Sequence, residues 1–96
     1  MTRNKTSVEF TLEPVDAHGD IIDPQHYDTF GAAYDDRMRV LATFPEAVAV
    51  DMAVVTRVGN DEDGEQSRTY DYRHRTMRDG TIIQLTRDGD PEPTTP

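Results

Sequence analysis

The stretch from Ala47 to Glu65 constrains the fold of this chain most, because a strand pattern runs directly into a loop of carboxylates. Between Ala47 and Val58 the larger apolar residues occupy every second position: Val48, Val50, Met52 and Val54. That period places them on one face of a pleated strand. The loop that follows holds four acids, Asp61, Glu62, Asp63 and Glu65. Only solvent, cations or a basic partner can accommodate so many carboxylates.

A second alternating segment, residues 7–14, predicts another half-buried strand. Its apolar positions are Val8, Phe10 and Leu12, and Pro14 is expected to end it. Residues 15–25 include Gly19, Pro24 and several acids, and therefore predict a connecting loop. A short extended piece is expected within that loop at Ile21 and Ile22.

One helix is predicted over residues 30–44. Its apolar residues recur at steps of four, four and three, which makes a helical stripe: Phe30, Tyr34, Met38 and Leu41. Asp28 or Thr29 can accept a hydrogen bond from the free amides of the first turn, and Pro45 stops the helix after Phe44. We expect this stripe to face the core.

Residues 68–77 alternate again and predict a strand with Tyr70, Tyr72 and His74 on one face. His74 is expected to be a partly buried strand residue. Asp79-Gly80 is a two-residue hairpin signal, because both positions of the tight turn need a positive φ. Residues 81–86 then form the return strand, and residues 88–96 form a flexible, acidic, proline-rich tail outside the single domain of residues 1–87.

The fold class predicted from this order is α+β, with one α-helix packed on a small, mainly antiparallel sheet in the order β-α-β-β-β. The last three strands make an antiparallel meander. The first strand should lie beside a strand of that meander, and the helical connection between them allows a parallel arrangement.

The net charge of the chain limits the classes of partner that it can bind. Nineteen acids against ten bases give a formal charge of −9, which disfavours nucleic acid and anionic membranes and favours basic surfaces. The absence of cysteine excludes disulfides and thiolate chemistry. With no signal-like or transmembrane-length apolar run, the sequence predicts a cytoplasmic protein.

Neither a metal site nor an enzyme is predicted. An EF-hand with Gly64 at its sixth position would need ligands where Gly59 and Tyr70 stand, so a calcium loop fails on spacing. The histidines lack metal-ligand spacing, and the adjacent Asp35 and Asp36 point in different directions on a helix. No nucleophile motif or phosphate loop is present. The sequence therefore predicts no catalytic residues, no metal and no cofactor.

Acids and bases are distributed unevenly along the chain. Between Lys5 and Arg37 every charged residue is an acid, whereas arginines gather in the 68–78 segment. Solubility and helix dipoles explain such acids equally well. If the interval and the 61–65 loop share a face, they form a row of carboxylates able to occupy a groove made for DNA phosphates. The candidate residues of the interval are Asp16, Asp20, Asp23, Asp28, Asp35 and Asp36.

As a small, acidic, cysteine-free domain without a catalytic motif, the chain resembles the inhibitors encoded by phages and mobile elements, especially anti-CRISPR proteins. The resemblance is one of protein type and extends over the whole chain, and it implies the host cell cytoplasm as the location if a phage encodes the protein. It implies a DNA-mimicking, non-catalytic inhibitor that binds the basic DNA channel of a type I CRISPR surveillance complex (Cascade), as a monomer. The arginines of residues 68–78 depart from a pure mimic.

Two other hypotheses stay open. One is a small structural or self-associating module whose arginine-bearing strand meets the acidic face of a neighbour. The other is a salt-adapted domain whose acidity serves solubility alone.

Overall fold

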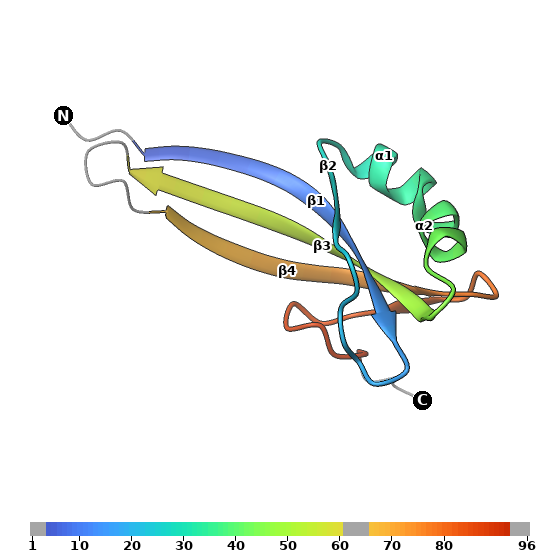
Figure 1. Ribbon diagram of the computed structural model, residues 1–96. Helices are drawn as coiled ribbons and strands as arrows, with labels where there is room; N and C mark the ends of the chain where they lie inside the picture. Colours follow the sequence, from blue (N-terminus) through green and yellow to red (C-terminus); the bar gives the residue numbers. More distant parts are fainter. Residues whose placement is uncertain (1–3, 61–65, 93–96) are drawn as a thin grey trace.

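The computed structural model describes residues 4–60 and 66–92, and these form one antiparallel five-stranded sheet with two short helices (Figure 1). The spatial order of the strands is β2-β1-β3-β4-β5. The elements are β1 (Asn4–Asp16), β2 (Gln25–Tyr27), α1 (Phe30–Asp35), α2 (Arg37–Thr43), β3 (Ala47–Asn60), β4 (Gln66–Met77) and β5 (Ile82–Gln84). The α+β class is confirmed at this level.

The predicted element order β-α-β-β-β is wrong, because residues 25–27 form the extra strand β2 and the helical region is two helices. β2 pairs antiparallel with the middle of β1, with Thr11 opposite His26. The helices therefore connect β2, not β1, to β3. β1 lies between those two strands and runs antiparallel to both, so the parallel placement of the first strand is also excluded.

β1 continues through Pro14 to Asp16, although Pro14 was expected to end it. The Pro14 carbonyl accepts a hydrogen bond from Ile22 N at 2.9 Å, on the edge of β1 that faces away from β3. Because the N–H and C=O of a strand residue point to the same side, the N–H that proline lacks would also have pointed to that edge. Pro14 therefore removes no hydrogen bond from the ladder with β3.

The predicted single helix is interrupted at Asp36, whose backbone (φ −94°, ψ −2°) lies outside the regular α-helical range. Arg37 Nε donates to the Tyr34 carbonyl at 2.8 Å and so satisfies an acceptor at the end of α1. The Asp36 carboxylate accepts hydrogen bonds from Tyr27 OH and from the Arg39 guanidinium. These side-chain bonds hold the break between α1 and α2.

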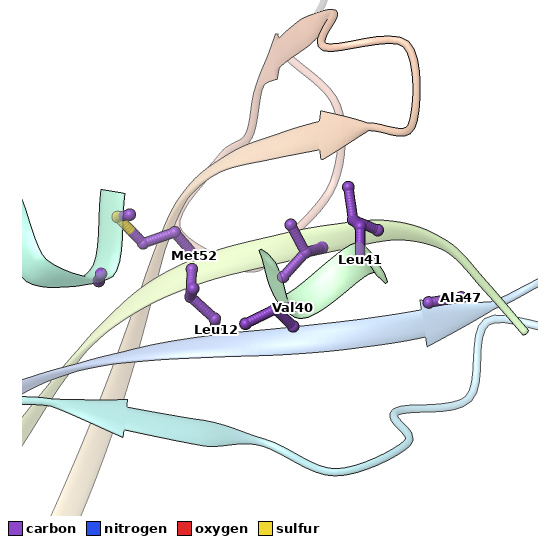
Figure 2. Close-up of a cluster of buried hydrophobic side chains, with 7 residues drawn as sticks. Leu12, Val40, Leu41, Ala47 and Met52 are labelled. Carbon is purple, nitrogen blue, oxygen red and sulfur yellow. The ribbon is translucent and has the colours of Figure 1, made fainter. Parts of the chain in front are cut away.

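The break changes which residues reach the core. The helices bury Ala33, Val40 and Leu41, whereas Phe30, Tyr34 and Met38 keep 47%, 37% and 46% of their surface exposed. The predicted stripe is thus wrong except at its last member. Figure 2 shows Val40 and Leu41 of α2 beside Leu12 of β1 and Met52 of β3, which form the apolar core.

β3 is the central strand and is buried on both faces. Val50 and Met52 point into the helix-side core as expected, but Val48 is exposed. The residues of its other face are buried as well: Ala49, Asp51, Ala53 and Val55. The sheet thus has a helix face, covered by α1 and α2, and a helix-free face.

A bulge in β4 separates two residues that were expected to share a face. Met52 lies opposite His74, while its neighbour Ala53 lies opposite Tyr72, so Arg73 is the extra residue. Successive residues of β3 point to opposite faces, and therefore His74 lies on the helix face and Tyr72 on the helix-free face. His74 is buried, as its pattern predicted.

The hairpin at Asp79-Gly80 is confirmed, with a different turn. Gly80 has a φ of +91°, but Asp79 does not have a positive φ. Gly80 N donates to the Met77 carbonyl, and the Asp79 carboxylate accepts from Thr81 N at 2.9 Å. The turn is therefore the longer kind, in which only its last residue is left-handed.

Residues 86–92, which include the start of the expected tail, turn back along β5. Thr86 N donates to the Asp90 carbonyl at 2.7 Å, and Glu92 N donates to the Gln84 carbonyl at 2.9 Å. Tyr72 N also donates to the Arg87 carbonyl at 3.1 Å, which continues the ladder on the outer edge of β4. This C-terminal turn is thereby brought against the sheet.

At the opposite end, the three long strands β1, β3 and β4 project beyond the helices (Figure 1). We call this part, residues 6–9, 55–59 and 67–71, the arm. Its side chains are mostly exposed, including Val8, Val58 and Tyr70. No helix in the described part of the chain is long and apolar enough to cross a membrane.

Candidate functional site: an acidic hollow on the helix-free face

The ten sequence-predicted acids fall into two groups. Asp61, Glu62, Asp63 and Glu65 lie outside the described residues. Of the other six, Asp20, Asp23, Asp28 and Asp35 are exposed, and Asp16 and Asp36 are partly buried.

Asp16 and Asp36 are held by intramolecular hydrogen bonds. Asp16 Oδ1 accepts hydrogen bonds from His18 N at 2.8 Å and from Asp20 N at 2.9 Å. Both backbone donors lower the pKa of Asp16, and the bond from Asp20 has the larger effect. The Arg39 guanidinium likewise lowers the pKa of Asp36. Both carboxylates thus stabilise local structure, which makes them weaker candidates for binding a partner.

The two acidic stretches of the sequence are anchored at opposite ends of β1. Asn4 pairs with Asn60, the residue before the 61–65 stretch, whereas Asp16 pairs with Ala47. Twelve residue steps along a strand span about 40 Å. Asp16 is therefore far from the β3 end at Asn60, whereas the pairing of Tyr27 with Phe10 brings the acids from Asp28 onward back beside the middle of β1.

The structure brings together a different pair of acids. Glu13 of β1 and Asp51 of β3 are direct cross-strand neighbours on the helix-free face, and each is 5% exposed. Arg75 of β4 lies opposite Asp51 and forms a two-point contact with it, from Nε to Oδ1 at 2.7 Å and from Nη2 to Oδ2 at 3.0 Å. Tyr72 OH donates to Glu13 Oε1 at 2.7 Å.

These side chains line a hollow of about 190 Å³, which we call the acidic hollow. The Gly19–Ile21 turn after β1 and the C-terminal turn complete its walls with Asp88 and Gly89. Gly89 has a φ of +95°, and a Cβ there would lie 3.2 Å from Tyr72 Cδ2. Glycine is thus required both for the turn and for the close approach of the C-terminal turn to Tyr72.

Burial and charge shift the titration of this cluster. Burial, together with the neighbouring Asp51 charge, raises the pKa of Glu13, while the Tyr72 hydrogen bond opposes the rise. Burial and the bond to Glu13 raise the pKa of Tyr72, so the phenol stays protonated and donates. Arg75 keeps its charge, because the bond to Asp51 raises its pKa further.

This arrangement of side chains is suited to binding a cation. Glu13, Asp51 and Asp88 can each carry a negative charge, and Arg75 is the one cation among the described lining residues. No group of three or more His, Cys, Asp or Glu side chains in residues 4–60 and 66–92 is arranged to hold a metal ion. A Lys or Arg side chain of a partner fits the local charge better than an anion does.

Sequence reasoning missed Glu13 and Asp51 as a site. A signal was present, since Asp51 interrupts an apolar strand between Ala49 and Ala53. A buried carboxylate needs a partner, so an acid at such a position predicts a nearby base. The identity of that base, Arg75, and the approach of Glu13 required the strand order.

No protein-family model, no curated protein sequence and no solved structure matches this chain.

Proposed function

We propose that this protein is a non-catalytic binding protein that engages a basic, nucleic-acid-binding protein, with the acidic hollow as its principal contact. The observation that carries the proposal is the cross-strand pair Glu13 and Asp51 at the wall of a surface hollow, where one arginine, Arg75, pairs with Asp51 and Glu13 accepts only from the neutral Tyr72 hydroxyl. Such a pair leaves a local excess of negative charge in a setting where burial weakens the screening by water.

The surroundings of the hollow extend the same charge. Asp20 and Asp23 are exposed in the segment that leads from β1 to β2, and Asp88 stands in the facing C-terminal turn. Together with the formal charge of −9, these residues would attract a basic partner from a distance and orient it toward the hollow.

The specific form of the proposal is the inhibitor suggested by the resemblance to anti-CRISPR proteins. In that form the partner is the basic DNA channel of a type I CRISPR surveillance complex, and the carboxylates take the place of DNA phosphates. The position of Glu13, Asp51 and Asp88 around one hollow favours contact through that end of the sheet.

Binding of a cationic probe tests the general proposal. Titration calorimetry with a hexa-arginine peptide should give an affinity that falls steeply between 50 and 500 mM NaCl. Asp88→Asn should weaken binding about 2- to 5-fold, as expected for the loss of one exposed charge pair. Asp35→Asn is the matched control, because Asp35 is an exposed acid on α1. Equal losses in the two variants would show that net charge, and not the hollow, drives binding.

A band-shift assay with a purified type I surveillance complex and its target DNA tests the specific form. The protein should reduce DNA binding, and Asp88→Asn should raise the concentration needed for half-inhibition. Normal DNA binding in the presence of a protein that still binds hexa-arginine would reject the CRISPR target while keeping the cation-binding hollow.

A second candidate is self-association through the arm. Within the described residues, the outer edge of β1 before Phe10 and the outer edge of β4 before Tyr72 pair with no further strand. Unpaired edges with exposed Val8 and Tyr70 are suited to pairing with another strand. Light scattering between 5 and 500 µM decides the matter: a concentration-dependent dimer supports self-association, and a monomer at every concentration rejects it.

A further inference from the structure

A second and larger hollow lies on the helix face and is separate from the acidic hollow. It has a volume of about 470 Å³ and lies among β1, the start of α1, β4 and the segment after β5. That volume is within the range of small-molecule sites, about 300–1,000 Å³. We call it the aromatic hollow, because Phe10 and Phe30 form one wall.

The aromatic wall is rigid and yet accessible. The rings of Phe10 and Phe30 meet edge to face, with centroids 6.0 Å apart, and Phe30 also stacks on Tyr34 at 5.6 Å. Despite these contacts Phe30 keeps 47% of its surface exposed. A large apolar ring that is held in place but uncovered can stack on a planar ligand with little loss of side-chain entropy.

His74 lines the same hollow and is the most unusual group in it. Its residue is 8% exposed, and neither Nδ1 nor Nε2 has a hydrogen-bond partner within residues 4–60 and 66–92. A buried polar atom without a partner costs about 1–3 kcal/mol, so such atoms call for an explanation. A neutral imidazole offers one donor and one acceptor, but both nitrogens are closed to solvent, so a ligand in the hollow supplies their missing partners only if the His74 ring turns toward it.

Two arginines line this hollow, although the chain as a whole is acidic. Arg73, the extra residue of the β4 bulge, lines it together with Arg87. Arg87 uses Nε for its 2.9 Å bond to Asp71. Asp71 neutralises Arg87, and Glu92 is the one carboxylate among the described lining residues, so Arg73 is the cation that the hollow offers to an acidic ligand group.

We propose that the aromatic hollow binds a small planar aromatic molecule that carries one acidic group. The ring packs against Phe30 and Phe10, the acidic group pairs with Arg73, and the His74 ring turns to hydrogen-bond to a polar atom of the ligand. This site uses none of the residues of the acidic hollow except Tyr72, which borders both. It would allow a metabolite to occupy one face of the sheet while a protein partner occupies the other.

Indole-3-acetate and its neutral analogue indole-3-acetamide are matched probes for this proposal. Titrations followed by amide chemical shifts should show indole-3-acetate binding with a millimolar or sub-millimolar Kd, at least about 5-fold tighter than the amide. The shifts should cluster at Phe10, Phe30, His74 and Gln84. Equal affinity for the two probes, no binding of either, or shifts confined to the arm would overturn the proposal.

Variants separate the three contacts. Phe30→Ala and Arg73→Gln change exposed residues, so folding should be preserved, and each should weaken indole-3-acetate binding about 5-fold or more. Arg73→Gln should also abolish the preference for the acid over the amide. Arg68→Gln, on the same strand but in the arm, is the control and should leave the Kd unchanged. Unchanged affinity in both Phe30→Ala and Arg73→Gln, with native circular dichroism, would reject the site.

Discussion

The two faces of the sheet carry different side chains, apolar on the helix face and charged on the helix-free face, although the same three strands form both. The helix face buries Leu12, Val50 and Met52 under Val40 and Leu41 of α2. The helix-free face places Glu13, Asp51 and Arg75 in a row across β1, β3 and β4. Apolar burial is non-directional, whereas a buried carboxylate requires a specific partner. The first face thus supplies stability, and the second is the face for which we propose specific recognition.

The polar row continues toward the arm on the helix-free face. Arg57 Nη2 bonds to Glu9 Oε1 at 2.7 Å, and both side chains are more exposed than Glu13 and Asp51. Solvent screening weakens an ion pair as exposure rises. The energetic importance of the row should therefore decline from Asp51 toward the arm.

The largest expected effect comes from the helix face. Leu12→Ala removes a fully buried side chain from the centre of the core and should lower the free energy of unfolding by about 2–5 kcal/mol. Urea denaturation followed by circular dichroism measures it. Val8→Ala is the control on the same strand and face, because Val8 is exposed in the arm, and its loss should be under about 1 kcal/mol. Similar losses at the two positions would mean that the arm is as well packed as the core.

A smaller but clear effect is expected on the helix-free face. Asp51→Asn keeps the size of the side chain but removes the charge that Arg75 contacts at two points, and should cost about 1–3 kcal/mol. The same denaturation experiment measures it. Asp71→Asn is the matched control, since the Arg87 partner of Asp71 is exposed, and its loss should be smaller. A neutral result for Asp51→Asn would remove the argument that this face depends on its ion pair.

A fall in pH should change the free energy of unfolding in opposite directions through groups on the two faces. This is the smallest of the expected effects. Burial, followed by the nearby Arg37 charge, lowers the pKa of His74 below its ordinary 6.5. The stabilising contribution of neutral His74 is present above pH 6.5 and is lost as the pH falls through the lowered pKa. His74→Gln should therefore flatten the loss of stability between pH 7 and pH 5.

Glu13 provides the opposite sign. Its pKa is raised above the ordinary 4.5, so its contribution is favourable below that value and is lost as the pH rises through the folded-state pKa. Glu13→Gln removes this dependence and keeps an oxygen that can accept from Tyr72. Relative to the wild type, the variant should gain stability as the pH rises above 4.5. Thermal unfolding across pH 4–8 checks both variants, and slopes of the same sign would contradict the contrast between the faces.

Some features of this protein follow from local sequence alone. The alternation in residues 7–14, 47–58 and 68–77 predicted the three long strands, because a period of two is a property of each strand by itself. Gly80 and its neighbours likewise specified the hairpin between β4 and β5. The α+β class followed from these local patterns.

Tertiary structure decided the rest, because it depends on contacts between residues far apart in the chain. The three residues of β2 are too few to show a period, and they form a strand because β1 offers an edge. The helix breaks at Asp36 through bonds to Tyr27 and Arg39, and the bulge at Arg73 sends Tyr72 and His74 to opposite faces.

The candidate sites show the same division. Composition and the spacing of acids indicated a basic partner but assigned the contact to acids scattered along the chain. The pairing of β1 with β3 placed Glu13 beside Asp51, although the two residues are far apart in the sequence. The Asp16 end of β1 lies about 40 Å from its Asn4 end. Sequence determined how much charge this protein carries, and the sheet decided where that charge is buried, since strand order sets which carboxylates become neighbours.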